Sequence, residues 1–423
     1  VKPVGRRVTA FLVQADNCVF EGFEVVGVQV TIAAGEANNT QSECFRVDGG
    51  NNNRFERLSM HDGMGIGWYL TSGGGNLVIN CDAYNNKGLD GLSHGNIDGF
   101  GAHTNRTTDT GNTFIGCRAW FNSDDGFDLI NNDAAVVISN CWAMYNGYDH
   151  ESTSSKIGDS TGFKAGGYGI GGGFYPTPVP RNRVLYCLAV ENSRGFYANH
   201  HTGGLDWIGN TAISNGTNYN MLNNLDATAA GNDVPGFDHY MKNNLGFGGG
   251  TEVSDLGTDP ASNNDVTSNY WTLPVTVTAA DFKSLSYALL TQVRQADGSL
   301  PNVDYARLVE GSDLIDVGTT NLDGAIPYYS GSAPDLGFLE FGLGDYGRGA
   351  GNFAGSDLND SAADFDGDGD IDLALGRNGA SRFLENNGTG TFTDVRAIGV
   401  TGVSRMTKGD LDADGDLDLV AVR

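Results

Sequence analysis

Short apolar segments alternate with polar turns along most of this chain, and the alternation repeats. Six blocks align without gaps, and each ends in Asn or Asp. Successive blocks lie about 24 residues apart, or further apart where a loop is inserted, and such a period indicates a solenoid with one supersecondary unit per repeat. Short apolar strands between Asn/Gly turns predict a parallel β-helix. The blocks are RLSMHD (57–62), CDAYNN (81–86), CRAWFN (117–122), CWAMYN (141–146), CLAVEN (187–192) and NTAISN (210–215).

Matching positions of successive coils should stack at the strand spacing of about 4.8 Å. The last position of the blocks therefore predicts an asparagine ladder in a turn, because Asn tolerates a left-handed backbone there. The first position predicts a stack of small, buried, unpaired thiols rather than disulfides. The ladder residues are Asn86, Asn122, Asn146, Asn192 and Asn215, and the stacked thiols are Cys81, Cys117, Cys141 and Cys187.

The segment after each ladder Asn carries a Gly and an apolar residue, which aligns the next strand of each coil. The aligned segments are GLS (91–93), GFD (126–128), GFK (162–164) and GFY (195–197). This alignment places Lys164 one coil above Asp128 and one coil below Tyr197.

Four aspartates gather on the same face. Asp98 falls in a loop inserted after the preceding coil, from which it converges on Asp124, Asp125 and Asp128. Like charges at this density repel one another and predict a bound cation. Carboxylate oxygens without His or Cys at metal-ligand spacing favour calcium. The alternative is that Asp124 and Asp125 only cap a turn.

Lys164 is the most informative member of this cluster. An isolated Lys has a pKa of about 10.4 and is a poor base at neutral pH. A nearby divalent cation and partial burial both disfavour the ammonium form, so we predict that Lys164 is a general base. The alternative is a surface salt bridge to Asp128, which would contribute little.

These motifs, in this order and spacing, resemble polysaccharide lyase family nine over most of residues 1–250. The segments that carry the resemblance are NIDGFGAH (96–103), GCRAWFNSDDGFDLI (116–130) and GFKAGG (162–167). The resemblance implies a right-handed parallel β-helix and calcium-assisted β-elimination on pectic polysaccharide, either polygalacturonate or rhamnogalacturonan I. It further implies that Asp98, Asp124, Asp125 and Asp128 bind Ca²⁺ and that Lys164 is the base.

Three further residues near these coils are candidate substrate contacts. Arg194 could pair with a uronate through two parallel hydrogen bonds, although a structural role is favoured for any single arginine. Tyr197 and His200 are predicted to contact the substrate, with ordinary packing as the alternative.

Two other functions remain compatible with the sequence. The first is a pectin-directed glycoside hydrolase that uses Asp124 and Asp125 as acid and base, which leaves Lys164 unexplained. The second is a non-catalytic extracellular protein for adhesion or structure, in which the aspartates hold structural calcium.

The chain divides into four parts. Residues 1–250 form the catalytic β-helix, residues 251–341 its last coils and a cap with a short helical stretch near 284–293, and residues 342–356 a Gly-rich linker. Residues 357–423 resemble FG-GAP/VCBS repeats of the propeller-blade type, and one complete repeat with a truncated second cannot close a propeller, so we expect a fragment. The candidate ligands of further calcium sites are Asp364, Asp366, Asp368, Asp370, Asp372, Asp410, Asp412, Asp414, Asp416 and Asp418.

Composition narrows the class of protein. The 423 residues include 63 Gly and 10 Pro, as solenoid turns require, and contain no apolar run long enough for a membrane span. A net charge of −27 argues against nucleic acid as a partner. We expect a secreted or cell-surface protein of bacterial type that acts on an acidic plant or algal polysaccharide. Since the charge would repel such a substrate, calcium must offset it locally. The sequence does not indicate an oligomeric state.

Overall fold

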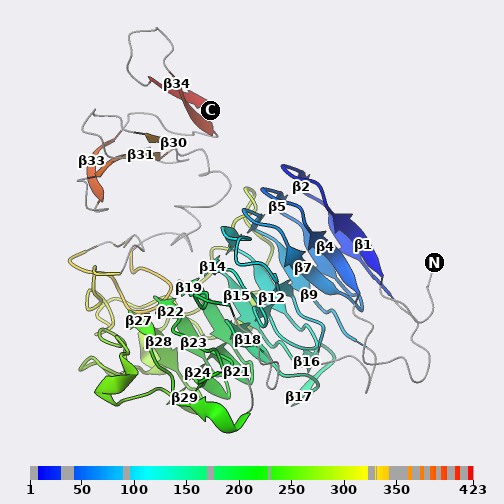
Figure 1. Ribbon diagram of the computed structural model, residues 1–423. Helices are drawn as coiled ribbons and strands as arrows, with labels where there is room; N and C mark the ends of the chain where they lie inside the picture. The colour runs from blue at the N-terminus through cyan, green and yellow to red at the C-terminus, as the bar shows by residue number, and fades with distance from the viewer. Residues whose placement is uncertain are drawn as a thin grey trace.

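A computed structural model of the chain describes residues 8–29, 42–88, 96–168, 176–226, 230–322, 329, 331–342 and six short strands between 361 and 422. Parallel strands stack coil upon coil into a β-helix (Figure 1). Its three long sheets have nine, eight and eight strands, and neighbours within a sheet come from successive coils. The predicted parallel β-helix is therefore confirmed.

Each coil contributes one strand to each sheet, as a solenoid requires. The first sheet contains β1 (Thr9–Val13), β4 (Glu43–Asp48), β7 (Ile66–Ser72), β10 (Phe100–Ala102), β13 (Phe127–Asp128), β18 (Thr161–Lys164), β21 (Arg194–Tyr197), β24 (Thr217–Asn220) and β29 (Thr251–Ser254). The second contains β2 (Val19–Glu21), β5 (Arg54–Glu56), β8 (Leu77–Ile79), β11 (Asn112–Ile115), β14 (Val136–Ser139), β19 (Arg183–Leu185), β22 (Asp206–Ile208) and β27 (Tyr240–Lys242). The third contains β3 (Glu24–Val26), β6 (Ser59–His61), β9 (Asp82–Tyr84), β12 (Arg118–Trp120), β15 (Trp142–Met144), β20 (Leu188–Val190), β23 (Thr211–Ile213) and β28 (Leu245–Phe247).

A column of aromatic rings fills the solenoid behind the first sheet. Phe127 stacks on Phe163 with ring centroids 4.9 Å apart, and Phe163 stacks on Phe196 at 5.1 Å. These spacings match the distance between neighbouring strands, so each ring lies directly above the last. Since successive side chains of a strand point to opposite faces, the residue after each ring points outward.

The predicted asparagine ladder is present, with one correction to its backbone. Asn122 donates a side-chain hydrogen bond to Asn146 Oδ1 at 3.0 Å, and the next rung repeats the bond to Asn192 at 3.4 Å. The left-handed backbone belongs to the residue before each ladder Asn, for example Phe121 (φ 52°) and Tyr145 (φ 50°), and not to the Asn itself. The ladder Asn therefore satisfies buried carbonyl groups of the coil, and its neighbour makes the turn.

The cysteine stack is also confirmed. Cys81, Cys117, Cys141 and Cys187 are buried free thiols at the same position of successive coils. The backbone N–H of Cys117 points at the sulfur of Cys141, 3.3 Å away. Burial raises the pKa of the Cys117 thiol well above its ordinary value, so the thiol stays protonated and behaves as a small apolar group.

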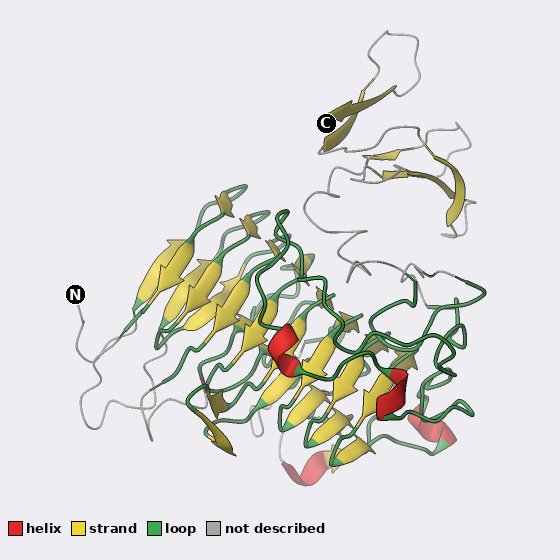
Figure 2. Ribbon diagram, turned by 180° about the vertical axis from the view of Figure 1, so that it is seen from behind, coloured by secondary structure: helices red, strands yellow, loops and turns green. Residues whose placement is uncertain are grey.

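Strands β15 and β20 of the third sheet are apolar on both faces. Their Ala143 and Ala189 face the interior, whereas Trp142 and Leu188 lie on the outside, where they are fully buried. The cover is a later stretch of the chain, which returns along this side of the solenoid (Figure 2). Its buried apolar side chains include Phe282, Leu290, Leu300, Tyr305, Leu308, Leu314, Leu336 and Phe338. We call residues 270–342 the lateral segment.

A buried ion cluster fixes the lateral segment to the coils. Asp82 in β9 accepts hydrogen bonds from Arg118 in β12, with Nη2 at 2.7 Å, and from Arg294 of the lateral segment, with Nη2 at 2.6 Å. Arg118 also donates to the carbonyl of Leu290 at 2.9 Å. The lateral segment therefore packs against one side of the solenoid. That it also caps the end of the coils stays a prediction.

The expected helical stretch near residues 284–293 is one turn of 3-10 helix, η6 (Tyr287–Leu289). The other 3-10 turns are η3 (Ala230–Asn232), η4 (Pro260–Ser262) and η5 (Ala279–Asp281). None of the helices in the described part of the chain is long and apolar enough to cross a membrane.

In the C-terminal part, β30 (Ser361–Ala363), β31 (Asp372–Leu375), β32 (Arg382–Asn386) and β33 (Phe392–Ala397) form an antiparallel sheet, and β34 (Arg405–Gly409) pairs with β35 (Asp418–Val422). Asp372 and Asp418 begin strands, whereas the other eight predicted ligands and the linker from residue 343 onward lie outside the described residues.

Candidate active site

Strand register places the predicted catalytic residues in one outward row. Asp128 pairs with Lys164, and Lys164 pairs with Tyr197, while Phe127, Phe163 and the next ring pair on the interior side. The predicted stacking of these three residues over successive coils is therefore confirmed.

The alignment of the preceding coil was wrong. Residues 91–93 lie outside the described residues, and the strand that pairs with Phe127 is β10, through Phe100. Gly101 thus occupies the row position next to Asp128. Asp98 lies two residues before β10, at the end of the long connection from β9, as predicted, and this position brings it to the aspartates of the next coil.

Each of the four predicted aspartates uses one oxygen to accept a backbone N–H. The N–H groups that Asp124 and Asp125 accept belong to residues 35 and 36 positions later in the chain, so these two bonds join successive coils and do not cap the local turn. Each bond leaves the second oxygen of its carboxylate for another partner. The bonds are Asp125 N to Asp98 Oδ1 (3.1 Å), Asp159 N to Asp124 Oδ1 (2.7 Å), Thr161 N to Asp125 Oδ1 (2.7 Å) and Ile130 N to Asp128 Oδ1 (2.7 Å).

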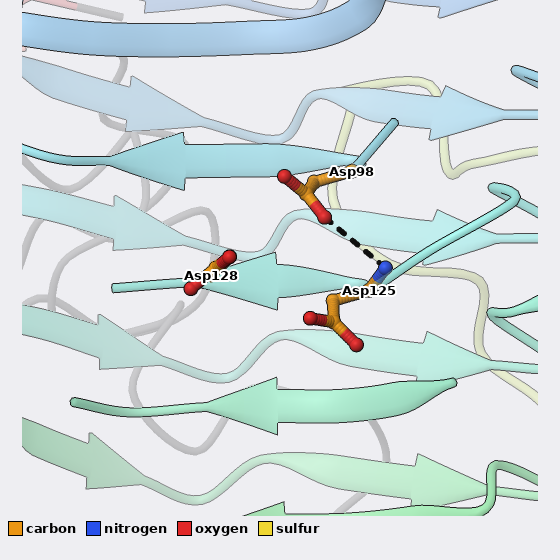
Figure 3. Close-up of side chains that lie close together, drawn as sticks. All are labelled: Asp98, Asp125 and Asp128. Atoms are coloured by element: carbon orange, nitrogen blue, oxygen red, sulfur yellow. Dashed lines mark hydrogen bonds between the residues drawn. The ribbon is translucent and has the colours of Figure 1, made fainter. Parts of the chain in front are cut away.

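The carboxylates form two overlapping groups rather than one. Oxygens of Asp98, Asp125 and Asp128 lie within 4.8 Å of one another (Figure 3). Asp124 belongs to a second group with Asp125 and the exposed Asp159, also within 4.8 Å. Asp159 was not among the predicted ligands, although its position five residues before Lys164 was a signal in the sequence.

Lys164 provides the counter-charge for both groups. Its Nζ lies 3.1 Å from Asp125 Oδ2, 3.3 Å from Asp128 Oδ2 and 3.9 Å from Asp159 Oδ2, and its side chain is 9% exposed. Burial alone would lower the pKa of Lys164, but the charges of Asp125 and Asp128 outweigh it and raise that pKa well above its ordinary value. Lys164 is therefore an ammonium group when the carboxylates are its only charged neighbours.

The aspartates respond in the opposite sense. Burial and the nearby charges of Asp128 and Asp125 raise the pKa of Asp98 well above its ordinary value. Burial, followed by the charges of Asp125 and Asp98, raises the pKa of Asp124 in the same way, and burial also raises the pKa of Asp125. One ammonium group cannot neutralise four buried carboxylates, so a bound cation would stabilise their ionised forms.

The donor set fits a hard divalent cation. Both groups are built of carboxylate oxygens, which calcium prefers, and backbone N–H groups already orient each carboxylate. Asp125 belongs to both groups and is the residue through which they are joined.

Aromatic and basic residues flank the cluster on its C-terminal side. The guanidinium of Arg194 lies 4.7 Å from the ring centroid of Tyr197. His200 Nδ1 lies 2.7 Å from Asp233 Oδ1, and its ring meets Tyr197 edge to face at 5.9 Å. Burial raises the pKa of Tyr197 to about 12, so its hydroxyl stays protonated. The three predicted substrate contacts are thus mutual neighbours, one coil beyond Lys164.

On the N-terminal side the chain places two residues with no predicted role. His103 Nδ1 lies 3.1 Å from the hydroxyl of Tyr69, and His103 Nε2 lies 3.8 Å from Asp128 Oδ1. Burial lowers the pKa of His103, so its ring is neutral. A neutral ring that accepts the Tyr69 O–H at Nδ1 carries its proton on Nε2, which faces Asp128.

Comparison with known proteins assigns the chain to a family. The family model described as a Pel9A-like, right handed beta helix region matches residues 4–244. The chain belongs to the Pel9A-like right-handed β-helix family. A second model, the FG-GAP-like repeat, matches residues 364–421, in agreement with the resemblance noted for the acidic repeats.

Two bacterial pectate lyases are similar in sequence to this chain. Pectate lyase L of Dickeya dadantii is 38% identical over 294 residues, which cover 69% of this chain and 62% of that protein. Pectate lyase L of Paenibacillus polymyxa is 31% identical over 290 residues, which cover 64% of this chain and 59% of that protein. The chain thus spans about three fifths of the length of these relatives.

Two solved structures share the fold. A structure titled rhamnogalacturonan lyase is 44% identical, with a TM-score of 0.67 over 72% of this chain and 73% of that one. The crystal structure of pectate lyase Pel9A is 36% identical, with a TM-score of 0.59 over 76% and 73% of the two chains.

Proposed function

We propose that this chain carries the catalytic domain of a calcium-dependent polysaccharide lyase that cleaves uronate-containing pectic polysaccharide by β-elimination. The observation that carries the proposal is the contact of Lys164 Nζ with Asp125 and Asp128, at 3.1 and 3.3 Å, in one outward row of the β-helix. A basic side chain beside a buried carboxylate cluster joins the two requirements of this reaction, a proton acceptor and a cation site.

Asp98, Asp124, Asp125 and Asp128 would hold the calcium ion, with Asp159 as an additional carboxylate. When bound there, calcium would offset the negative charge that keeps Lys164 protonated and would act as a Lewis acid toward the carboxylate of a uronate. The backbone N–H groups of Asp125 and Thr161 hold the carboxylates in place for that role.

Lys164 is the base in this mechanism. Its unprotonated amine takes the proton from C5 of the uronate, and the electron pair of that C–H bond forms the C4–C5 double bond. The bond from C4 to the glycosidic oxygen breaks, its electron pair leaves with that oxygen, and the oxygen then takes a proton from water. Burial favours the neutral amine once the neighbouring charge is offset, because desolvation opposes the ammonium form. The product carries an unsaturated sugar at its new end.

Arg194, Tyr197 and His200 are proposed substrate contacts on the next coil. A guanidinium held over an aromatic ring keeps a fixed orientation and can pair with a uronate carboxylate. The names of the relatives, pectate lyase and rhamnogalacturonan lyase, support polygalacturonate and rhamnogalacturonan I as the two substrates to compare. We propose secretion or cell-surface attachment for the same reason.

The hydrolase alternative, in which Asp124 and Asp125 act as acid and base, gives no role to Lys164, whose Nζ lies 3.1 Å from Asp125 Oδ2. The non-catalytic alternative leaves unexplained why a Lys is buried against the carboxylates, since a purely structural calcium site gains nothing from a competing cation.

The test is the ultraviolet absorbance of unsaturated product on each polysaccharide, with calcium and then with chelator. Calcium-dependent absorbance on either substrate supports the lyase. Reducing ends without absorbance would instead favour hydrolysis, and no reaction by a folded protein on either substrate would favour the adhesion alternative.

The acidic repeats are a separate proposal. We propose that Asp364 to Asp372 and Asp410 to Asp418 bind further calcium ions, as the match to the FG-GAP-like repeat supports. Calcium titration of the full chain, with and without alanine at Asp366 and Asp412, would test it.

A further inference from the structure

The outward row that carries Asp128 and Lys164 continues across the whole first sheet. Register pairs Arg46 of β4 with Tyr69 of β7, then Tyr69 with Gly101 of β10, and Gly101 with Asp128. At about 4.8 Å per coil, Arg46 lies roughly 14 Å from Asp128 along the row. A sugar chain laid across the coils with one uronate at the carboxylate cluster would therefore extend over Arg46.

Arg46 is held in a fixed orientation at that distance. Its guanidinium carbon lies 5.8 Å from the ring centroid of Tyr69, and its Nη1 donates to Glu43 Oε1 at 3.3 Å. Glu43 is the hydrogen-bond acceptor of Arg46 within the described part of the chain, so most of the five guanidinium N–H donors are uncommitted there. The side chain is 19% exposed, so part of it is accessible to a ligand.

The support beneath Arg46 is itself fixed. Tyr69 is buried, and its hydroxyl bonds His103 Nδ1 at 3.1 Å, with the two rings edge to face at 5.0 Å. Little entropy is then lost when the guanidinium binds an anion, because the ring and its partner already restrict it.

Gly101 leaves room for the Tyr69 ring between Arg46 and the cluster. A Cβ at Gly101 would lie 2.9 Å from Cδ2 of Tyr69 and 3.6 Å from Nε2 of His103, so a side chain there would displace the ring that supports Arg46.

The same pairing of residues occurs on the other side of the cluster. Arg194 lies over Tyr197 as Arg46 lies over Tyr69, with guanidinium-to-centroid distances of 4.7 and 5.8 Å. Two Arg-over-Tyr pairs thus bracket the carboxylates and Lys164 on the first sheet.

We propose that Arg46, held over Tyr69, is a distal subsite that binds the carboxylate of a uronate about three coils from Asp128 on the N-terminal side of the site. The proposal rests on the proposed lyase function and adds the residue that recognises a remote unit of the same acidic chain. Planar, bidentate recognition of a carboxylate is the chemistry to which a guanidinium is suited.

The test compares oligogalacturonates from trimer to octamer as substrates of the full chain. Arg46→Gln should raise KM for the octamer about tenfold, the equivalent of one charge-assisted hydrogen bond, and raise KM for the trimer less than twofold, with kcat little changed. Arg46→Lys keeps a positive charge beside the buried Glu43 but loses the planar fork, so it should fold normally and show an intermediate effect. Arg54→Gln is the matched control, since Arg54 bonds Glu56 on the second sheet, and it should leave the length dependence unchanged.

A purely structural Arg46 gives a different result. An equal change for trimer and octamer with a lowered Tm, or no change in either variant, overturns the subsite. If the wild-type chain cleaves only rhamnogalacturonan I, the same comparison uses short and long oligomers of that polysaccharide. If it yields no unsaturated product from either polysaccharide, the lyase proposal fails, and octamer binding to Lys164→Ala protein by calorimetry then decides the subsite alone: weaker binding in the Arg46→Lys background supports it, and equal binding overturns it.

Discussion

The Nζ atom of Lys164 lies 3.1 Å from Oδ2 of Asp125, although the two residues are 39 positions apart in the chain. The contact exists because β18 pairs with β13 in register, so that one coil of the solenoid places the amine above the carboxylates of the coil before. The same contact would tie the charge of the proposed base to the occupancy of the proposed cation site.

Removing that amine separates the catalytic from the structural interpretation. Lys164→Ala should lower kcat for formation of unsaturated product about a thousandfold, because a general base contributes on that order. It should also tighten calcium binding about tenfold, since a competing ammonium group leaves the carboxylates.

The measurements are absorbance of unsaturated product and calorimetric titration of calcium. Lys283→Ala is the control, because Lys283 is half exposed and lies 3.9 Å from the surface Asp304. Full activity in the Lys164 variant would refute the base assignment.

Calcium binding should release protons. Burial and mutual repulsion raise the pKa values of Asp98, Asp124 and Asp125, so these groups retain protons at pH values where ordinary aspartates are ionised. Because the cation binds the ionised forms, the calcium Kd should rise as pH falls below neutrality, well before the ordinary aspartate pKa of about 3.9 is reached.

Calorimetry in two buffers of different ionisation enthalpy measures the released protons directly. A calcium Kd that stays constant from pH 8 to pH 5, with no buffer dependence of the heat, would contradict the prediction. Far-ultraviolet circular dichroism at each pH ensures that the protein remains folded over the range.

The two overlapping carboxylate groups predict unequal effects of single substitutions. Asp125→Asn should weaken calcium binding about a hundredfold, because Asp125 belongs to both groups and is fully buried. Asp159→Asn should weaken it only a few-fold, because Asp159 is exposed and belongs to one group. Equal losses in the two variants would show that the groups do not act as described.

The buried cluster around Asp82 predicts a large effect on stability. Asp82→Ala leaves Arg118 and Arg294 without their carboxylate partner and should lower the free energy of unfolding by about 3 to 5 kcal/mol. Asp304→Ala is the control in the lateral segment, and as an exposed pair with Lys283 at 3.9 Å it should cost less than about 1 kcal/mol. Urea denaturation of both variants measures the difference.

The ion cluster around Asp82 also predicts a loss of folding stability at acid pH. Burial opposes ionisation of Asp82, but the charges of Arg294 and Arg118 outweigh it and lower the pKa of Asp82 to about 2. Since this folded-state pKa lies below the unfolded value, the stabilisation is present above about pH 4 and is lost as pH falls toward 2. Thermal melts of the wild-type chain between pH 5 and pH 2 should show this loss, and the Asp82→Ala protein should show a smaller one.

The sequence by itself determined the coil and the outward row. Strand pairing fixes the rise of each coil, so a repeat of matching blocks was sufficient to place Asp128, Lys164 and Tyr197 over one another and to stack the buried thiols. The acidic character of the site followed from the same register.

Only the tertiary structure decided the features that depend on loop length and on distant packing. Insertions of variable length made Gly91–Ser93 look like the row segment that Gly99–Gly101 provides, and they concealed the approach of Asp159 to Lys164. Trp142 and Leu188 face outward and are buried because the chain returns along that side much later, a contact that no local period encodes. A periodic sequence specifies which residues stack on one another in successive coils. Contacts between loops of unequal length, or between distant segments, form only when the whole chain packs.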